Sequence, residues 1–252
     1  MIGFFRRIRK KLADDNKPLK YMRYAIGEIV LVVVGILIAL QVNNWNNELE
    51  NRLLEVKILE EIQSNLENDL EEIKDDINTM EYAKQSCSRM IIHLNEHSTP
   101  SVAFFNYAIW MQIVPHFDPN RSGYSLLESN GVALILNDSL RTSISNHYEL
   151  SYPYYNKYEN ERIQFKVNQT NSFLLNNFDW LLDEKDEGVY GLYISDKDYK
   201  KIKNDGSLRK LINANIWEND ALLTRAIRTK QKIIDLLAMI SNELLKIKEK
   251  QS

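Results

Sequence analysis

The chain has 252 residues, of which 44% are hydrophobic and 27% charged, and its formal net charge is -3. This composition excludes an intrinsically disordered chain and a transporter with many spans. Only 8 glycines and 5 prolines are present, which argues against a β-sandwich or barrel rich in turns. A single cysteine, Cys87, excludes an intramolecular disulfide and a thiolate zinc site. We therefore expect an all-α protein.

The N-terminal end is strongly basic. Residues 1–23 contain eight lysines and arginines and two aspartates, a net charge of +6. Phe4 or Phe5, Ile8 and Leu12 recur among them at helical spacing. We expect residues 1–18 to form a cytoplasmic basic segment. It is either an amphipathic helix lying in the lipid headgroups or only a signal that sets the topology.

An apolar stretch follows directly. Residues 24–42 carry one charged side chain, Glu28, and their number suits a spanning helix, which needs about 17–25 residues. We expect a transmembrane helix over 19–44, with Trp45 as its interfacial anchor. Residues 39–44 offer no small-x-small cleavage site, so we expect an uncleaved signal anchor. Positive charge before the span predicts a single-pass protein of the inner (cytoplasmic) membrane, with its N-terminus in the cytoplasm and residues 45–252 outside it.

Four residues of the span are functional candidates. Gly27, Gly35 and Ala39 fall on one helical face, where small side chains allow close approach of a second helix, although such residues are common in spans. Glu28 is a candidate because an ionisable group within a span is costly. The competing explanation is that Glu28, about 7 Å beyond Arg23 along the helix, snorkels to the headgroups.

The outer region begins with a long periodic stretch. No Gly or Pro occurs from Trp45 to Thr99, and apolar residues recur at steps of three and four: Leu59, Ile62, Leu66, Leu70, Ile73, Ile77 and Met80. This pattern predicts an amphipathic helix of unusual length that can be continuous with the span. Asp69 and Asp76 would occupy seam positions of a strict heptad, which favours a bundle over a coiled coil.

The rest of the chain predicts further helices. The expected segments are a short apolar piece at 104–114, a helix at 122–130 ended by Gly131, a run from a cap at Asp138 to about 182 bent at Pro153, a loose and partly β-like stretch at 184–206, and a last helix at 217–248. Together they predict an antiparallel bundle of long helices with short connecting helices.

Several stretches resemble a known family. They are residues 4–9, residues 24–46, and the looser matches at 124–131, 138–141 and 147–149. They resemble an uncharacterised family of short, single-pass bacterial membrane proteins that is common in Bacteroidota. The family carries no known activity, so the resemblance implies an anchored membrane protein and transfers no catalytic residue. It also places six residues inside the family's motif: Gly27, Glu28, Gly35, Asn43, Asn44 and Trp45.

One motif has the spacing of a metal site. His93, Glu96 and His97 match H-x-x-E-H, in which two histidines one helical turn apart ligate zinc and the glutamate acts as base. Histidines at the end of a helix are also favoured by the helix dipole alone. The sequence pattern does not indicate which residue would be a third zinc ligand. The chain shows no triad spacing and no phosphate-binding glycine loop. We therefore predict no enzyme, metal or cofactor, with a zinc hydrolase as a remote alternative.

A cluster of tyrosines surrounds Pro153: Tyr148, Tyr152, Tyr154, Tyr155 and Tyr158. Aromatic side chains with a polar tip suit an interaction surface, and they equally suit packing around a proline kink. From residue 43 onwards the chain has 24 basic and 32 acidic residues, a net charge of -8. An acidic domain lacks the electrostatic footprint for nucleic acid.

These patterns predict a membrane-anchored, non-enzymatic interaction, scaffold or accessory module. Its expected partners are the lipid bilayer and either another protein or a second copy of the chain. The alternative is an extracytoplasmic ligand-binding sensor domain. Because only 23 residues precede the apolar stretch, such a sensor is expected to act through a partner in the membrane.

Overall fold

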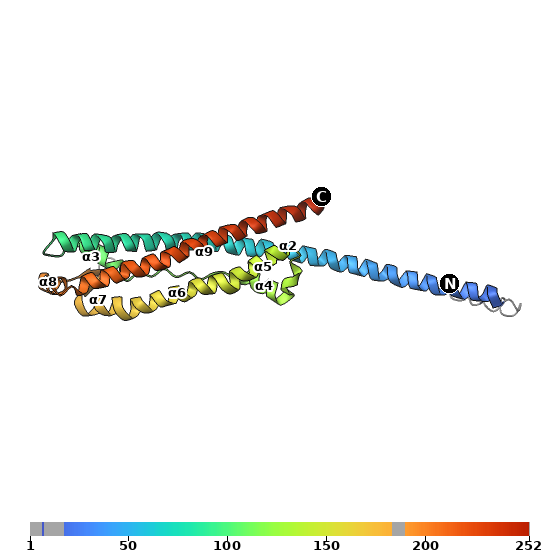
Figure 1. Ribbon diagram of the computed structural model, residues 1–252, viewed down its shortest axis with the longest axis horizontal. Coiled ribbons are helices and arrows are strands. Elements are labelled where there is room, and N and C mark those ends of the chain that lie inside the picture. The colour runs from blue at the N-terminus through green and yellow to red at the C-terminus, as the bar shows by residue number, and fades with distance from the viewer. Residues whose placement is uncertain (1–6, 8–17, 183–189, 252) are drawn as a thin grey trace. The chain divides into compact units, whose positions relative to one another are not determined.

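The computed structural model describes Arg7 and residues 18–182 and 190–251, and these residues are mostly helical (Figure 1). The elements are α2 (Pro18–Glu96), α3 (Val102–Ile109), α4 (Ser122–Asn130), η1 (Val132–Leu134), α5 (Asp138–Asn146), η2 (His147–Ser151), α6 (Tyr152–Phe165), η3 (Lys166–Asn171), α7 (Ser172–Asn177), β1 (Asp179–Leu182), β2 (Tyr190–Tyr193), α8 (Asp196–Asn204) and α9 (Ser207–Gln251). The chain divides into two compact units, Met1–Glu55 and Val56–Ser252. Most of the predicted basic segment lies outside the described residues.

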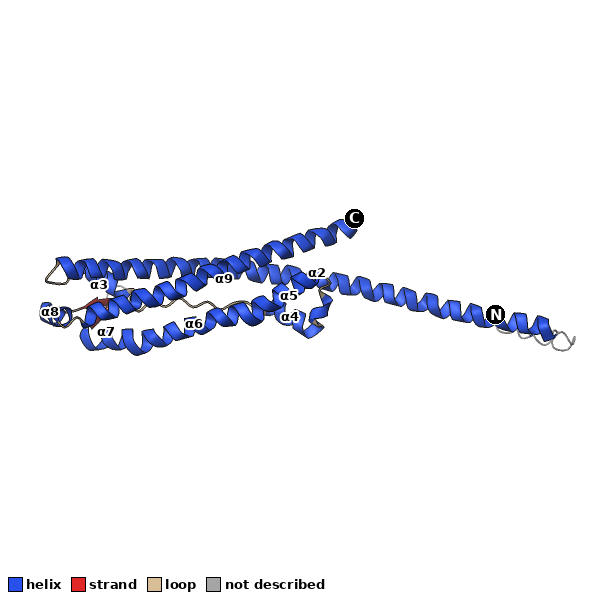
Figure 2. Ribbon diagram, in the orientation of Figure 1, coloured by secondary structure: helices blue, strands red, loops and turns tan. Residues whose placement is uncertain are grey.

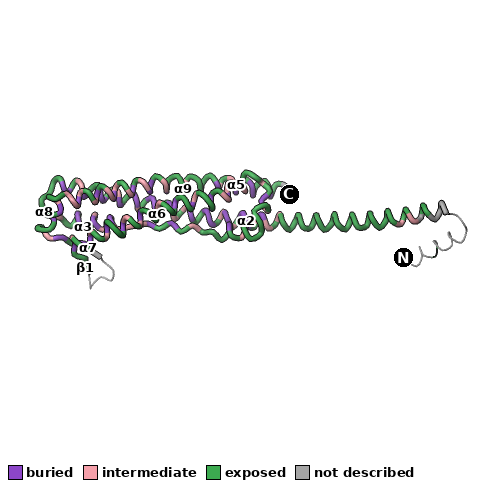
Figure 3. The backbone as a smooth tube through the Cα atoms, turned by 60° about the horizontal axis from the view of Figure 1, so that its bottom comes forward, coloured by how far each residue is buried: buried purple, intermediate pink, exposed green. Residues whose placement is uncertain are grey.

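The first unit contains the apolar part of α2. Its large apolar side chains between Ile26 and Val42 are 46–71% exposed, and the tube is green along this stretch (Figure 3). Among the described residues, α2 is the one helix long and apolar enough to cross a membrane, with a mean hydropathy of 2.6 in its most apolar window. A signal sequence near an N-terminus can have the same length and composition. The predicted long apolar helix near the N-terminus is confirmed.

In the second unit, α2 buries one face. The buried apolar positions repeat at helical spacing: Ile58, Leu59, Ile62, Leu66, Ile73, Ile77, Met80, Ala83, Cys87, Met90 and Leu94. This agrees with the predicted stripe, except that Leu70 is only half-buried. Asp69 and Asp76 lie on the same face and are 1% and 8% exposed. Carboxylates in such positions need partners, because burial without them is costly.

The second helical run, from α5 to α7, is interrupted twice. η2 and η3 are π-helical turns, and η2 ends two residues before Pro153, where we expected a bend. Proline cannot donate to the carbonyl four residues earlier, so the regular hydrogen-bond pattern cannot pass through it. The run ends at Asn177 rather than near 182, because Asp179–Leu182 pairs antiparallel with Tyr190–Tyr193 as a two-stranded sheet (Figure 2).

Helix α9 lies alongside α2 and α6 of this unit (Figure 1). Polar contacts with α2 join Glu60 to Lys248, Gln63 to Ser241, Lys84 to Asp220 and Asn95 to Arg209, so residue numbers rise along one helix as they fall along the other. The helix begins ten residues earlier than predicted. The sequence predicts an apolar face of this helix that consists of Ile227, Ile234, Leu237, Ile240, Leu244 and Ile247. That prediction was wrong at Ile227 and Ile234, which are 45% and 38% exposed, because Ile233 and Leu236 take the buried positions.

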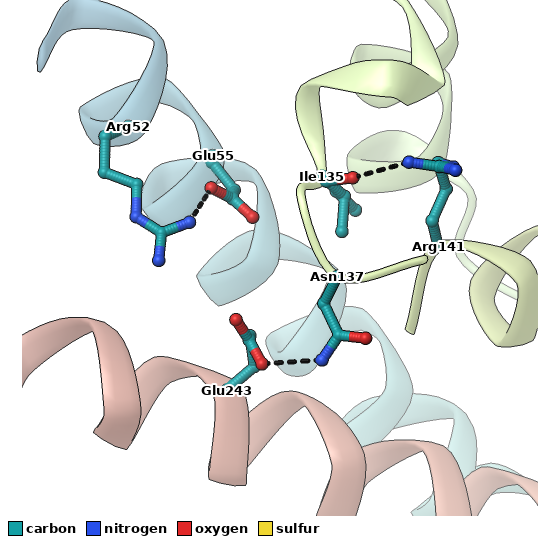
Figure 4. Close-up of polar contacts among 6 residues, drawn as sticks. All are labelled: Arg52, Glu55, Ile135, Asn137, Arg141 and Glu243. Carbon is teal, nitrogen blue, oxygen red and sulfur yellow. Dashed lines mark hydrogen bonds and ion pairs between the residues drawn. The ribbon is translucent and has the colours of Figure 1, made fainter. Parts of the chain in front are cut away.

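The short elements close the two ends of the unit. Cys87, Met90, Phe104, Tyr199 and Ile212 belong to an apolar cluster that joins the end of α2 to α3, α8 and the start of α9. At the other end, Asn137 rather than Asp138 caps α5, because its side-chain oxygen accepts from the N–H of Leu140. The Nδ2 of Asn137 also donates to Glu243 of α9 at 2.7 Å, which fixes the start of α5 against that helix (Figure 4).

Candidate functional site

The predicted tyrosine cluster is divided by the fold. Tyr148, Tyr152 and Tyr155 are at most 3% exposed. The ring of Tyr148 stacks on Tyr124 with centroids 4.5 Å apart, and both Tyr152 and Tyr155 meet the ring of Phe117 edge-on. Burial raises the pKa of all three phenols, so they are neutral hydroxyls at physiological pH. These three tyrosines pack the interior of the bundle.

The other two tyrosines lie on the outside. Tyr154 is 53% exposed, and its ring meets that of Tyr158 with centroids 5.0 Å apart. The guanidinium of Arg225 on α9 lies over the ring of Tyr158, 3.6 Å from its centroid, a short cation–π contact. Trp217, two turns earlier on α9, is 73% exposed and lines the same open cavity as Arg225. We call Tyr154, Tyr158, Trp217 and Arg225 the aromatic–arginine patch.

An irregular segment that is buried in part lies against both α2 and α6. We call residues 111–120 the strap. Its carbonyls accept from two cations of the α6–η3 run: Lys166 donates to Met111, and Arg162 donates to Ile113. This polar backbone belongs to no helix or sheet, so side chains must satisfy it.

The N–H groups of the strap meet carboxylates. The N–H of Phe117 donates to Glu159 at 2.9 Å, and that of Asn120 donates to Asp69 at 2.9 Å. A third N–H, that of Asp118, donates to Glu72 at 3.2 Å. Carbonyls therefore face cations and N–H groups face carboxylates, which gives the strap charge-assisted hydrogen bonds along its length.

Amides of α9 provide further partners for the two cations. Arg162 and Lys166 are each 1% exposed. Arg162 donates to the side-chain oxygen of Asn219, and Lys166 donates to that of Asn215 at 2.5 Å. Asn215 also donates to the hydroxyl of Thr170 at 3.1 Å. The strap, the α6–η3 run and α9 are thereby joined by one buried polar network.

Three groups of this interior, Asp76, Lys166 and Cys87, have strongly shifted pKa values. Burial, with the nearby charge of Glu159 as the next cause, raises the pKa of Asp76 to about 7. Burial, followed by the charge of Arg162, lowers the pKa of Lys166 to about 7. The thiol of Cys87 has its pKa raised to about 11 by burial, so it stays protonated and unreactive. Shifted groups of this kind occur in functional sites and in structural networks alike.

Helix α4 makes a close approach to α2. Asn65 accepts from the N–H of Gly123 at 2.9 Å and from the hydroxyl of Ser122 at 3.1 Å. A Cβ on Gly123 would lie 2.8 Å from the backbone nitrogen of Ile62. Only glycine allows this contact. The next glycine, Gly131, ends α4 with φ +89, as the sequence predicted.

The H-x-x-E-H motif lies at the end of α2. The ring of His93 is buried and its Nδ1 lies 3.1 Å from the hydroxyl of Tyr199, while Glu96 and His97 are exposed. Burial, and then the charge of His97, lowers the pKa of His93. Within the described ranges, no three His, Cys, Asp or Glu side chains are arranged to hold a metal ion. Our prediction that the chain is not an enzyme stays a prediction.

The candidates in the apolar part of α2 belong to the first unit. A Cβ on Gly27 or Gly35 would meet no atom within 4 Å, and Ala39 is exposed. Glu28 is half-exposed and takes part in an interaction within the structure. These positions offer room for close approach of a second helix. Their functional role stays a prediction.

One family model matches the chain, over residues 28–201, which is more than half of it. The chain belongs to the family of unknown function DUF6090. The DUF6090 match contains Glu28, the tyrosine cluster, the strap and Lys166, and it ends within α8. No curated protein and no solved structure matches the chain.

Sequence reasoning missed the strap and its two cations. The signal was present, because Tyr155, Glu159, Arg162, Lys166 and Thr170 follow one another at steps of three and four. That is the spacing of a buried helical face, occupied here mostly by polar side chains. Such a pattern predicts that the face packs on backbone polar groups.

Proposed function

We propose that this DUF6090 protein is a single-pass inner-membrane protein whose extracytoplasmic antiparallel helical bundle is a non-enzymatic interaction or accessory module. The main observation behind this proposal is the change in exposure of the apolar side chains along α2. Its apolar side chains between Ile26 and Val42 are exposed, while its later part buries one face. Exposed apolar surface of this extent marks a membrane or protein contact, and its length suits a bilayer.

The charge distribution supports the orientation. The net charge of +6 over residues 1–23 lies on the N-terminal side of the apolar stretch, and the region from residue 43 onwards has a net charge of -8. Basic flanks stay in the cytoplasm. The N-terminus is therefore cytoplasmic and the bundle extracytoplasmic in this proposal.

The aromatic–arginine patch supports an interaction role. Tyrosine, tryptophan and arginine are the residue types that contribute most to binding energy at protein interfaces. Arg225 is already stacked on Tyr158, and its Nη1 donates to the carbonyl of Ala221 at 2.6 Å. A side chain ordered before binding loses less conformational entropy in a complex. The partner in this proposal is a protein that contacts the patch.

Topology is tested by cysteine labelling in a Cys87→Ala background. A cysteine is introduced at Glu161, an exposed position of α6, and a membrane-impermeant maleimide is added to spheroplasts. We expect labelling without lysis and retention of the protein in membranes after alkaline carbonate extraction. Labelling only after lysis would contradict the orientation, and release by carbonate would contradict the anchor.

The interaction role is tested by site-specific photocrosslinking in native membranes. Benzoylphenylalanine is placed at Tyr154 and, as a matched control, at Val167, which is also 53% exposed but lies outside the patch. We expect one discrete crosslinked product at position 154 that weakens when Trp217→Ala is added. Equal products at both positions, or none at 154, would contradict the proposal.

A further inference from the structure

A cavity lies between the η3–α7 segment and the first turns of α9. It is an open groove of about 560 Å³, within the size range of ligand sites. Phe165 and Phe173 contribute half-buried aromatic rings, and Leu211 and Ala214 of α9 contribute aliphatic surface. The groove therefore has an apolar part on both of its walls.

Side-chain amides dominate the polar part of this groove. Asn168, Gln169, Asn176 and Asn177 all line it. The amide nitrogens of Asn176 and Asn177 donate to the carbonyls of Ser172 and Phe173, at 2.8 and 2.9 Å. Each of these two amides is thus held in one orientation by its own helix, with its oxygen left as an acceptor.

The charge of the groove differs from that of the domain. None of the described residues that line it is Asp or Glu, although the region from residue 43 onwards has a net charge of -8. Lys210 is the one cation among the lining residues that the structure describes. The groove is therefore a neutral to weakly positive surface on an acidic protein.

The two walls are held together from behind. Asn215 of α9 donates to Thr170 of η3, and both side chains are completely buried. Lys166, the first residue of η3, donates to the same Asn215. The groove residues Gln169 and Ala214 are the immediate sequence neighbours of this network. A fixed spacing of the walls is the preorganisation that a binding site needs.

We propose that this groove binds an oligosaccharide. Sugar hydroxyls both donate and accept hydrogen bonds, as side-chain amides and the hydroxyls of Ser172 and Ser207 do. Aromatic rings present flat apolar faces to the C–H faces of a sugar ring. Strongly anionic ligands fit less well because they are bound mainly by arginines, and none of the described lining residues is Arg. The π-helical turn along one wall agrees with this role, since such turns are frequent at functional sites.

The test uses the purified full chain in detergent and three probes: the trimer of N-acetylglucosamine, maltotriose and the trimer of galacturonic acid, whose three carboxylates should make it bind more weakly than the neutral sugars. Saturation-transfer NMR detects binding and calorimetry gives the Kd. We expect at least one trisaccharide to bind, and Asn176→Ala and Gln169→Ala to weaken it at least tenfold. Both side chains are exposed, so neither substitution disturbs the core.

Val167→Ala is the control, because Val167 lies in the same turn, is 53% exposed and does not line the groove. It should leave the Kd unchanged within twofold. Failure of all three sugars to bind would overturn the proposal. So would binding that the groove variants leave unchanged, or binding of trialanine, tried as a peptide probe, in place of every sugar.

Discussion

The hydroxyl of Tyr152 donates to Oδ2 of Asp69 at 2.6 Å in the buried interior. The other oxygen of the same carboxylate accepts from the N–H of Asn120 in the strap. One aspartate of α2 therefore joins α6 and the strap. Burial raises the pKa of Asp69, and the two hydrogen bonds oppose that rise by favouring the charged form.

Replacement of Tyr152 by Phe should destabilise the protein by about 2 kcal/mol, because it leaves a buried carboxylate oxygen without its donor. Urea unfolding followed by circular dichroism measures the change. Tyr154→Phe is the matched control, since Tyr154 is 53% exposed, and it should have little effect. Equal stability of the two variants would show that the Tyr152–Asp69 hydrogen bond contributes nothing.

Gly123→Ala should also destabilise, by about 2 kcal/mol, because the new Cβ would lie 2.8 Å from the nitrogen of Ile62 and α4 would have to shift. The same substitution at Gly191 is the control. Its Cβ would meet Leu181 at an ordinary 3.5 Å. Thermal unfolding of both variants measures the difference. A Tm for Gly123→Ala equal to that of Gly191→Ala would contradict the close approach of α4 to α2.

The shifted carboxyl group of Asp76 predicts a fall in stability between about pH 4 and 7. Its pKa is raised from 3.8 to about 7, so the unfolded chain loses this proton first and the native state becomes relatively less stable as pH rises. The charged groups around it are Glu159, Glu72, Arg162 and Asp75. Asp76→Asn should reduce this pH-dependent fall in stability and increase the free energy of unfolding at pH 8 by about 2 kcal/mol.

Lys166 has the opposite effect at higher pH. Its pKa is lowered from 10.5 to about 7, with Arg162, Cys87 and Glu218 as its charged or titratable neighbours. The unfolded chain holds the extra proton between pH 7 and 10.5, so stability from this group rises over that range. Urea unfolding at several pH values between 4 and 10 measures this change. The free energy of unfolding of Lys166→Met should not rise with pH in the upper part of that range. A variant curve parallel to that of the wild type would contradict the shift.

Metal analysis of the purified full chain tests the H-x-x-E-H motif. We expect no stoichiometric zinc, because among the described residues no three His, Cys, Asp or Glu side chains are arranged to hold a metal ion. His97→Ala should leave the metal content unchanged. One equivalent of zinc that disappears in His97→Ala would favour the hydrolase alternative.

Much of the helical content follows from local patterns in the sequence. The absence of Gly and Pro from 45 to 99 and the apolar period of α2 predicted its length, and Gly131 predicted the end of α4. These are local signals, because they depend only on the backbone preference of a residue or on the helix face that its position in the sequence period gives it. The tyrosines show the limit of such signals. Their sequence spacing does not say which side of α6 faces α9, and that decides which of them are buried.

The strap could not be predicted locally. Its ten residues have no period, and the charged side chains that bond to their backbone groups lie 42 to 55 positions away in the sequence. The sequence pattern places Asp69 and Asp76 among the apolar positions of α2, and both side chains are indeed buried on that face. What they face is settled only by tertiary packing. The groove between η3–α7 and α9 depends on the same packing.

Hydrogen exchange should show that Glu159 holds the strap. Glu159→Ala removes the acceptor of the Phe117 N–H, a buried 2.9 Å hydrogen bond. A buried N–H without a partner costs about 1–3 kcal/mol, so we expect that amide to exchange roughly ten to a hundred times faster in mass-spectrometric measurements. Glu161→Ala, at an exposed position of the same helix, is the control. Unchanged exchange in Glu159→Ala would mean that apolar packing of Phe117 holds the strap without the carboxylate.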